Sequence, residues 1–192
     1  MTDNPNAPNK FGRTPIYKAA WNGHTEIVKI LAPLTENPNA PNNNGETPIH
    51  EAVCNGHTEI VKIMAPLTGN PNAPNNVGET PIHWAVYNGD TEIVKILVPF
   101  TDNPNAPDNE GDTPIHYAAK NGYTEIVKIL APLTDSPNAP NNTGKTPIYW
   151  AALKGHEEIV KILAPFTGNP NAPNNYADTP NLLPSKIWAY RN

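Results

Sequence analysis

Residues 80–89 read Thr-Pro-Ile-His-Trp-Ala-Val-Tyr-Asn-Gly, and this stretch recurs along the chain. Near-copies begin at Thr14, Thr47, Thr113 and Thr146, and a degenerate sixth copy begins at Thr179. Each copy starts 33 residues after the previous one. A fixed period of about 20–50 residues is typical of arrays of small supersecondary units. The sequence therefore predicts a repeat protein in which each unit packs mainly against its neighbours.

The repeat divides the chain into units that we expect to form one domain over 1–192. A partial N-terminal unit covers 1–13, full repeats cover 14–46, 47–79, 80–112, 113–145 and 146–178, and a degenerate C-terminal cap covers 179–192. Residues 2–13 match the tail of a repeat, so the array is either cut from a longer one or starts naturally at this point. In the cap, Asn181 and Pro184 replace an Ile and an Ala, while Leu182, Leu183, Ile187 and Trp188 could cover the apolar end of the fifth repeat.

Composition excludes several classes of protein. The formal charge of the 192 residues is -5 and no basic block occurs, which argues against nucleic acid or an anionic membrane as a partner. A single cysteine, Cys54, excludes an internal disulfide framework and fits a reducing compartment. The N-terminus lacks the regions of a signal peptide, and no apolar run approaches the length of a membrane span. We expect a cytoplasmic or recombinant soluble protein.

Each repeat carries signals for two helices. Thr47 can cap a first helix whose first residue is Pro48, and Gly56 can end it in a left-handed conformation. A second helix begins at Thr25 in the first repeat, and the spacing of its apolar residues predicts a buried face of Ile27, Val28, Ile30 and Leu31. Pro33 should stop or kink this helix near Ala32, because the residue before a proline disfavours helical geometry. The remaining residues of the repeat, rich in Asn and Pro, predict an extended finger that ends in a turn.

These motifs resemble one known family. Thr-Pro-Ile-His-x-Ala-Ala, Asn-Gly-His-Thr-Glu-Ile-Val-Lys-Ile-Leu and Asn-Ala-x-Asn-x-x-Gly, in that order, are similar to the ankyrin repeat over residues 2–178. The resemblance implies an all-α ankyrin-repeat solenoid of paired antiparallel helices with projecting β-turn fingers. The chain departs from the family pattern where Thr35 replaces the usual Gly and where Pro33 enters the last turn of helix two. The near-identity of the repeats fits either a natural, recently duplicated array or an engineered consensus binder.

When the repeats are aligned, each position forms a column, and the columns whose residue changes from repeat to repeat are the candidate binding positions. They are the fifth and eighth positions of each helix one, which lie on one helix face, and two positions in the turn of each finger. The candidate partner-binding residues are Phe11, Arg13, Lys18, Trp21, Glu46, Glu51, Val77, Glu79, Trp84, Tyr87, Glu110, Asp112, Tyr117, Lys120, Trp150, Leu153 and Tyr176. Three of the four tryptophans are among them, and such side chains are enriched in protein interfaces. The resemblance implies that these positions line a concave face that binds partner proteins.

A narrower hypothesis assigns a ligand to part of this face. Trp84, Tyr87, Tyr117 and Trp150, beside the acidic residues Glu79, Glu110 and Asp112, could form an aromatic site for a cationic side chain. The alternative is a flat aromatic patch within a protein-binding groove.

The repeating histidines carry no predicted chemistry. His50, His83 and His116 align in consecutive repeats, but stacked helices lie roughly 8–10 Å apart, and metal ligands must all approach one ion to about 2 Å. We expect these histidines to form local hydrogen bonds that fix the Thr-Pro turn. Cys54 is expected to be exposed, and no nucleophile elbow, phosphate loop or carboxylate pair occurs. We assign no enzymatic activity, metal or cofactor.

The sequence thus favours a non-enzymatic module that binds a protein or peptide on its aromatic-rich face. The competing hypotheses are a structural scaffold or spacer without a partner of its own, and an enzyme or metal protein. We expect a monomer, with weak self-association left open.

Overall fold

The computed structural model describes residues 6–169 and 173–179. The predicted cap at 179–192 therefore lies outside the described residues except for Thr179. The chain forms two compact units, 1–104 and 105–192. The described residues contain helices and turns but no strand, and none of their helices is long and apolar enough to cross a membrane.

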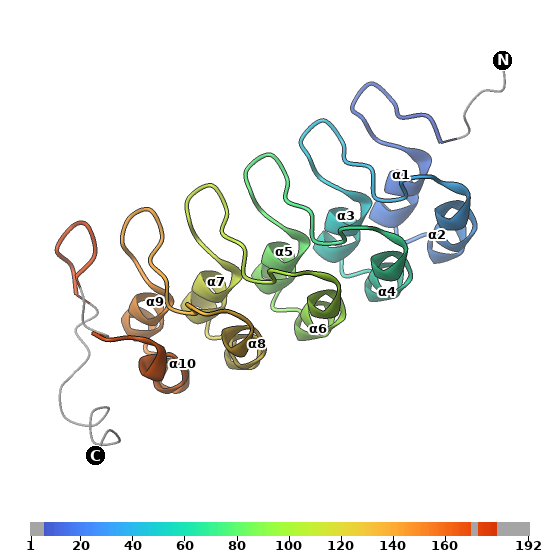
Figure 1. Cartoon of the computed structure of the whole chain (residues 1–192). Coiled ribbons are helices and arrows are strands. Elements are labelled where there is room, and N and C mark those ends of the chain that lie inside the picture. Colours follow the sequence, from blue (N-terminus) through green and yellow to red (C-terminus); the bar gives the residue numbers. More distant parts are fainter. Residues whose placement is uncertain (1–5, 170–172, 180–192) are drawn as a thin grey trace. The chain divides into compact units, whose positions relative to one another are not determined.

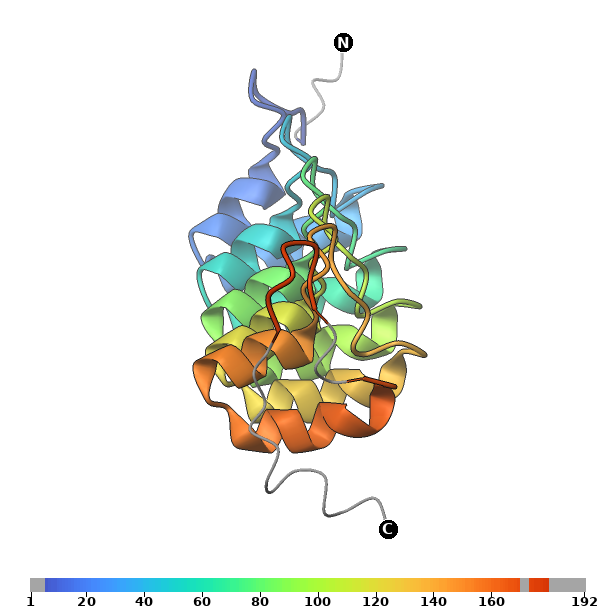
Figure 2. The ribbon, with the colours of Figure 1, turned by 90° about the vertical axis from the view of Figure 1, so that its left-hand side faces the viewer.

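The first unit holds three helix pairs. They are α1 (Pro15–Trp21) and α2 (Thr25–Leu31), α3 (Pro48–Cys54) and α4 (Thr58–Met64), and α5 (Pro81–Asn88) and α6 (Thr91–Leu97). The second unit holds two pairs, α7 (Pro114–Asn121) with α8 (Thr124–Leu130) and α9 (Pro147–Lys154) with α10 (Glu157–Leu163). Within each unit the pairs stack side by side and their fingers project from the same edge (Figures 1 and 2).

Local sequence sets the ends of the first helix of each repeat, as α5 illustrates. Thr80 caps α5 in extended geometry, its side chain accepts the His83 backbone N–H, and Pro81 occupies the first helical position. Gly89 ends the same helix with φ of 70°, a left-handed conformation that residues with a Cβ adopt only with strain. These predicted caps are confirmed.

The proline in each second helix shortens it as predicted. The α-helical part of α2 ends at Leu31, and a 3-10 turn over Ala32–Leu34 follows. The same turn follows the second helix of every repeat, at Ala65–Leu67, Val98–Phe100, Ala131–Leu133 and Ala164–Phe166. Pro33 lies in this tighter turn, beyond the end of the α-helix, so its missing N–H interrupts no run of α-helical hydrogen bonds.

Burial between neighbouring repeats forms the core. Within the first unit α2 packs on α4 and α4 on α6, and Ile60 and Met64 of α4 are completely buried. The first repeat differs, because Ile27 is 47 % exposed and Ile30 is 63 % exposed. The prediction that these two residues are buried is wrong, since no helix of the described chain packs on that side of α2.

Polar bridges connect successive repeats. The buried His50 accepts the Thr47 backbone N–H at Nδ1 (3.1 Å), and its Nε2 donates to the Glu79 carbonyl in the next repeat (3.1 Å). His116 joins Thr113 and Lys145 in the same way, at 3.0 and 3.1 Å. The predicted local role of these histidines is confirmed, and the bond to the next repeat adds a second role.

The asparagines of the finger explain its repeating sequence. Asn39 Oδ1 accepts the backbone N–H of Ile49 in the first turn of α3, at 3.2 Å. The Asn43 backbone N–H donates to the Phe11 carbonyl of the preceding finger, at 3.1 Å. Its side-chain amide also donates to the Lys10 carbonyl, at 3.2 Å. The finger is thus fixed both to the following helix and to the finger before it.

The buried histidine makes stability depend on pH. Burial lowers the pKa of His50 to about 4, below its usual value, so folding favours the neutral ring. As pH falls, the unfolded chain binds the proton first, and stability is lost between about pH 6.5 and pH 4. We expect His50 to account for a loss of about 2 kcal/mol in the free energy of unfolding between pH 7.5 and pH 5.

Urea unfolding of the wild type and of His50→Gln, a non-titrating replacement, measures this contribution. The exposed His24, replaced in His24→Gln, provides the control and should keep the wild-type pH dependence. An identical pH dependence in His50→Gln and the wild type would contradict the assignment.

Candidate partner-binding surface

The columns that vary between repeats lie on the outer side of each helix one and on the fingers. We call these columns the variable face. In the first unit it comprises the candidate residues Phe11, Arg13, Lys18, Trp21, Glu46, Glu51, Val77, Glu79, Trp84 and Tyr87. In the second unit it comprises Glu110, Asp112, Tyr117, Lys120, Trp150, Leu153 and Tyr176. Of all these, Glu51 alone is buried; the others are half-buried or exposed.

In the first repeat, cations of the chain itself cover the aromatic rings. The Lys18 Nζ lies 3.9 Å from the centroid of the Trp21 ring, and the Arg13 guanidinium carbon lies 4.7 Å from it. Lys10 and Arg13 also lie over Phe11, at 5.0 and 5.6 Å. This part of the variable face is therefore basic and aromatic, and its rings already have cation partners.

Glu51, predicted as a partner-binding residue, is buried instead. Its side chain is 9 % exposed and accepts a hydrogen bond from the hydroxyl of the buried Tyr17. Tyr17 stands where the second, third and fourth repeats have histidine, and its longer side chain reaches the fifth position of the next repeat. Asn42 completes the cluster by donating to the Tyr17 hydroxyl (2.8 Å) and to Glu46 (2.7 Å). Burial, and then the bond to Glu51, raise the pKa of Tyr17 above its usual range.

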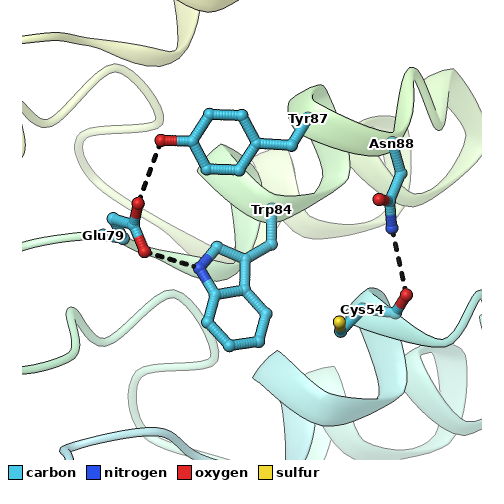
Figure 3. Close-up of a pocket in the computed structure, with 5 residues that line it drawn as sticks. All are labelled: Cys54, Glu79, Trp84, Tyr87 and Asn88. Carbon is cyan, nitrogen blue, oxygen red and sulfur yellow. Dashed lines mark hydrogen bonds between the residues drawn. The ribbon is translucent and has the colours of Figure 1, made fainter.

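A pocket opens between the second and third repeats, within the first unit (Figure 3). Its volume is about 320 Å³, and its lining residues are Cys54, Glu79, Trp84, Tyr87 and Asn88. Glu79 joins the two aromatic side chains, because its carboxylate accepts the Trp84 indole N–H and the Tyr87 hydroxyl, each at 3.0 Å. The Trp84 ring also meets the ring of His50 edge-on, at 5.0 Å between centroids.

The second unit has a different chemistry. Lys120 and Lys145 lie over the Trp150 ring, with Nζ 4.8 and 5.1 Å from its centroid. Lys145 also approaches Tyr176, which is 68 % exposed. The hypothesis of an acid-rimmed aromatic site therefore does not hold at Trp150. Lys145 occupies the finger position after the turn glycine, where the second repeat has Glu79, and this lysine makes the cluster basic.

Two other candidate residues of the second unit, Tyr117 and Asp112, form hydrogen bonds with neighbouring polar side chains. The Tyr117 hydroxyl donates to Asp108 at 2.9 Å, and Asn141 donates to Asp112 at 2.8 Å. Burial raises the pKa of Asp112 above its usual value. Of the seven residues in the narrower hypothesis, the structure joins Glu79, Trp84 and Tyr87 by hydrogen bonds.

Asn88 is not among the predicted site residues, because four of the five repeats have an asparagine at that position. In two repeats a histidine bridges to the repeat before it, as when His57 Nε2 donates to the Trp21 carbonyl at 3.1 Å. Asp90 replaces that histidine in the third repeat and caps α6 through the Ile93 backbone N–H. Asn88 makes the bridge instead, donating to the carbonyls of Val53 and Cys54. The one sequence signal was Asp90, the only aspartate in that column.

Two features that could carry chemistry are a metal-binding cluster and the single thiol. Residues 6–169 and 173–179 contain no group of three or more His, Cys, Asp or Glu side chains that could hold a metal ion. The single thiol, Cys54, is exposed at the rim of the pocket. Partial burial, and then the Glu51 and Glu46 carboxylates, raise its pKa above the usual value, which disfavours the nucleophilic thiolate.

Stacked helix pairs with projecting fingers define the class of all-α repeat solenoids. A family model for ankyrin repeats in three copies matches residues 2–75 and 66–141, and a model for the single ankyrin repeat matches residues 143–175. The chain belongs to the ankyrin-repeat family. A search of curated proteins found no match. Ankyrin repeats generally serve as protein–protein interaction modules.

The raised pKa of Cys54 predicts slow alkylation of the native chain. At pH 7.5 iodoacetamide should modify Cys54 more slowly than in the urea-unfolded chain, because less thiolate is present. Glu51→Gln removes a nearby negative charge and should accelerate the native reaction by roughly two- to threefold. Glu59→Gln, at an exposed position of α4, should leave the rate unchanged, and a native rate equal to the unfolded one would contradict the assignment.

Proposed function

We propose that the chain is a non-enzymatic interaction module that binds a protein or peptide through its variable face. The observation that carries the proposal is the contrast between a buried isoleucine column that stays constant and surface columns that change. Ile49, Ile82, Ile115 and Ile148 repeat without change and are at most 1 % exposed. The variable face instead exposes different large side chains in different repeats, among them Phe11, Val77, Leu153 and Tyr176.

The chemistry of the variable face suits a protein partner. Large apolar and aromatic side chains lie there beside charged ones, and such a mixture is typical of protein interfaces. Its charge changes from basic around Arg13 and Lys18 to acidic at Glu79, the last residue of the second repeat. A face whose charge and shape change along the chain can select one partner, which a strictly periodic surface cannot do as well.

A second apolar surface repeats instead of varying. Its members are the exposed residues that end the 3-10 turns, Leu34, Leu67, Phe100, Leu133 and Phe166. This turn stripe serves as a control surface, because it exposes side chains of similar size on the same protein.

The test compares two triple variants of confirmed helicity. Trp84→Ala/Tyr117→Ala/Trp150→Ala removes aromatic side chains from the variable face, and Leu67→Ala/Phe100→Ala/Leu133→Ala removes apolar ones from the turn stripe. Both variants and the wild type serve as baits in cell extract, and each retained protein is then purified and titrated against all three.

We expect a partner whose affinity falls by about 100-fold or more in the variable-face variant, since interface tryptophans contribute a large share of binding energy. The turn-stripe variant should bind within about threefold of the wild type. Equal binding by all three baits would contradict the proposal, and loss in the turn-stripe variant alone would place the interface on the turn stripe.

A further inference from the structure

The pocket around Trp84 differs from the other tryptophan clusters of the variable face. Trp21 is covered by Arg13 and Lys18, and Trp150 is covered by Lys120 and Lys145. In the described part of the chain, no Lys or Arg lies over the Trp84 ring. The fold thus supplies a cation to two of its tryptophans and a carboxylate, Glu79, to the third.

Glu79 fixes the geometry of the pocket. Its carboxylate holds the edge of Trp84 through one oxygen and the hydroxyl of Tyr87 through the other, so both rings are oriented by the same negative charge (Figure 3). Asn75 donates to the oxygen that also accepts from Trp84, at 3.4 Å. A carboxylate can accept about four hydrogen bonds. The remaining capacity therefore lies on Oε1, the oxygen that accepts from Tyr87.

The surroundings of the pocket are negative. Among the described residues that line it, Glu79 alone is charged, and the Glu46 and Glu51 carboxylates act on Cys54 at its rim. Its volume of about 320 Å³ exceeds what a single side-chain head group fills. A cation entering the pocket would meet an aromatic face and a carboxylate together, which are the two groups that stabilise a desolvated cation.

We propose that this pocket binds an arginine side chain of the partner, an inference that rests on the proposed function and names the group that the first unit recognises. Guanidinium is planar, so it can stack on the Trp84 indole while an N–H donates to Oε1 of Glu79. An ammonium group is more strongly hydrated and cannot stack in this way, so lysine fits the pocket less well.

The test uses small probes on the full chain. N-acetyl-arginine methylamide is compared with its citrulline counterpart, which has nearly the same shape but no charge, and with the lysine counterpart. Two readouts lie in the pocket itself: the NMR resonance of the Trp84 indole N–H, assigned with Trp84→Phe, and protection of Cys54 from alkylation.

We expect the arginine probe to shift the indole resonance and slow alkylation with an affinity at least about fivefold higher than that of the citrulline probe. Glu79→Gln keeps the size of the side chain and removes its charge, so it should reduce the ratio of arginine affinity to citrulline affinity to about one. Glu59→Gln removes the same charge from α4 and should leave arginine binding within about twofold of the wild type.

Equal affinities for arginine and citrulline, or an unchanged arginine affinity in Glu79→Gln, would overturn the proposal. Lysine binding as tightly as arginine would overturn the choice of arginine. These results are separate from the test of the proposed function. A partner that is lost with the variable-face triple variant but retained by Glu79→Gln would support the variable face and contradict the arginine pocket.

Discussion

Burial of one repeat's apolar residues against the next repeat is the constraint on which the structure depends. Each helix is only seven or eight residues long, too short to be stable alone. Ile60 and Met64 reach complete burial because α2 and α6 lie on either side of α4. In the described chain no helix packs on the other side of α2, and there Ile27 and Ile30 stay exposed. Stability is therefore a property of adjacent repeats and not of any repeat by itself.

This constraint leaves only part of each repeat free to change. The buried isoleucines, the His50 bridge and the finger asparagines all contact the neighbouring repeat, so a change in any of them disturbs two repeats. The fifth and eighth positions of helix one and the variable positions of the finger turns are half-buried or exposed, and Glu51 is the buried exception. The accessible positions carry tryptophan, lysine or glutamate in different repeats, so the surface chemistry varies along a regular fold.

Features that depend on one repeat alone could be predicted from the sequence. The Thr80 cap, the left-handed Gly89 and the short second helix before Pro33 follow from local stereochemistry. Features that depend on two repeats could not be predicted in this way, because comparing one position across the repeats does not show which side chain of the neighbouring repeat lies against it. Glu51 is buried because the preceding repeat has Tyr17. The surroundings of Trp150 are basic because Lys120 and Lys145 lie over its ring.

Column-matched substitutions measure the dependence on neighbours most directly. Ile27 and Ile60 occupy the same column within the identical local sequence Thr-Glu-Ile-Val-Lys-Ile, and they differ in the repeat that precedes them. By urea unfolding, Ile60→Ala should lower the free energy of unfolding by about 3 kcal/mol, and Ile27→Ala by about 1 kcal/mol or less. Equal losses would contradict the account, because stability would then reside in each repeat and not between repeats.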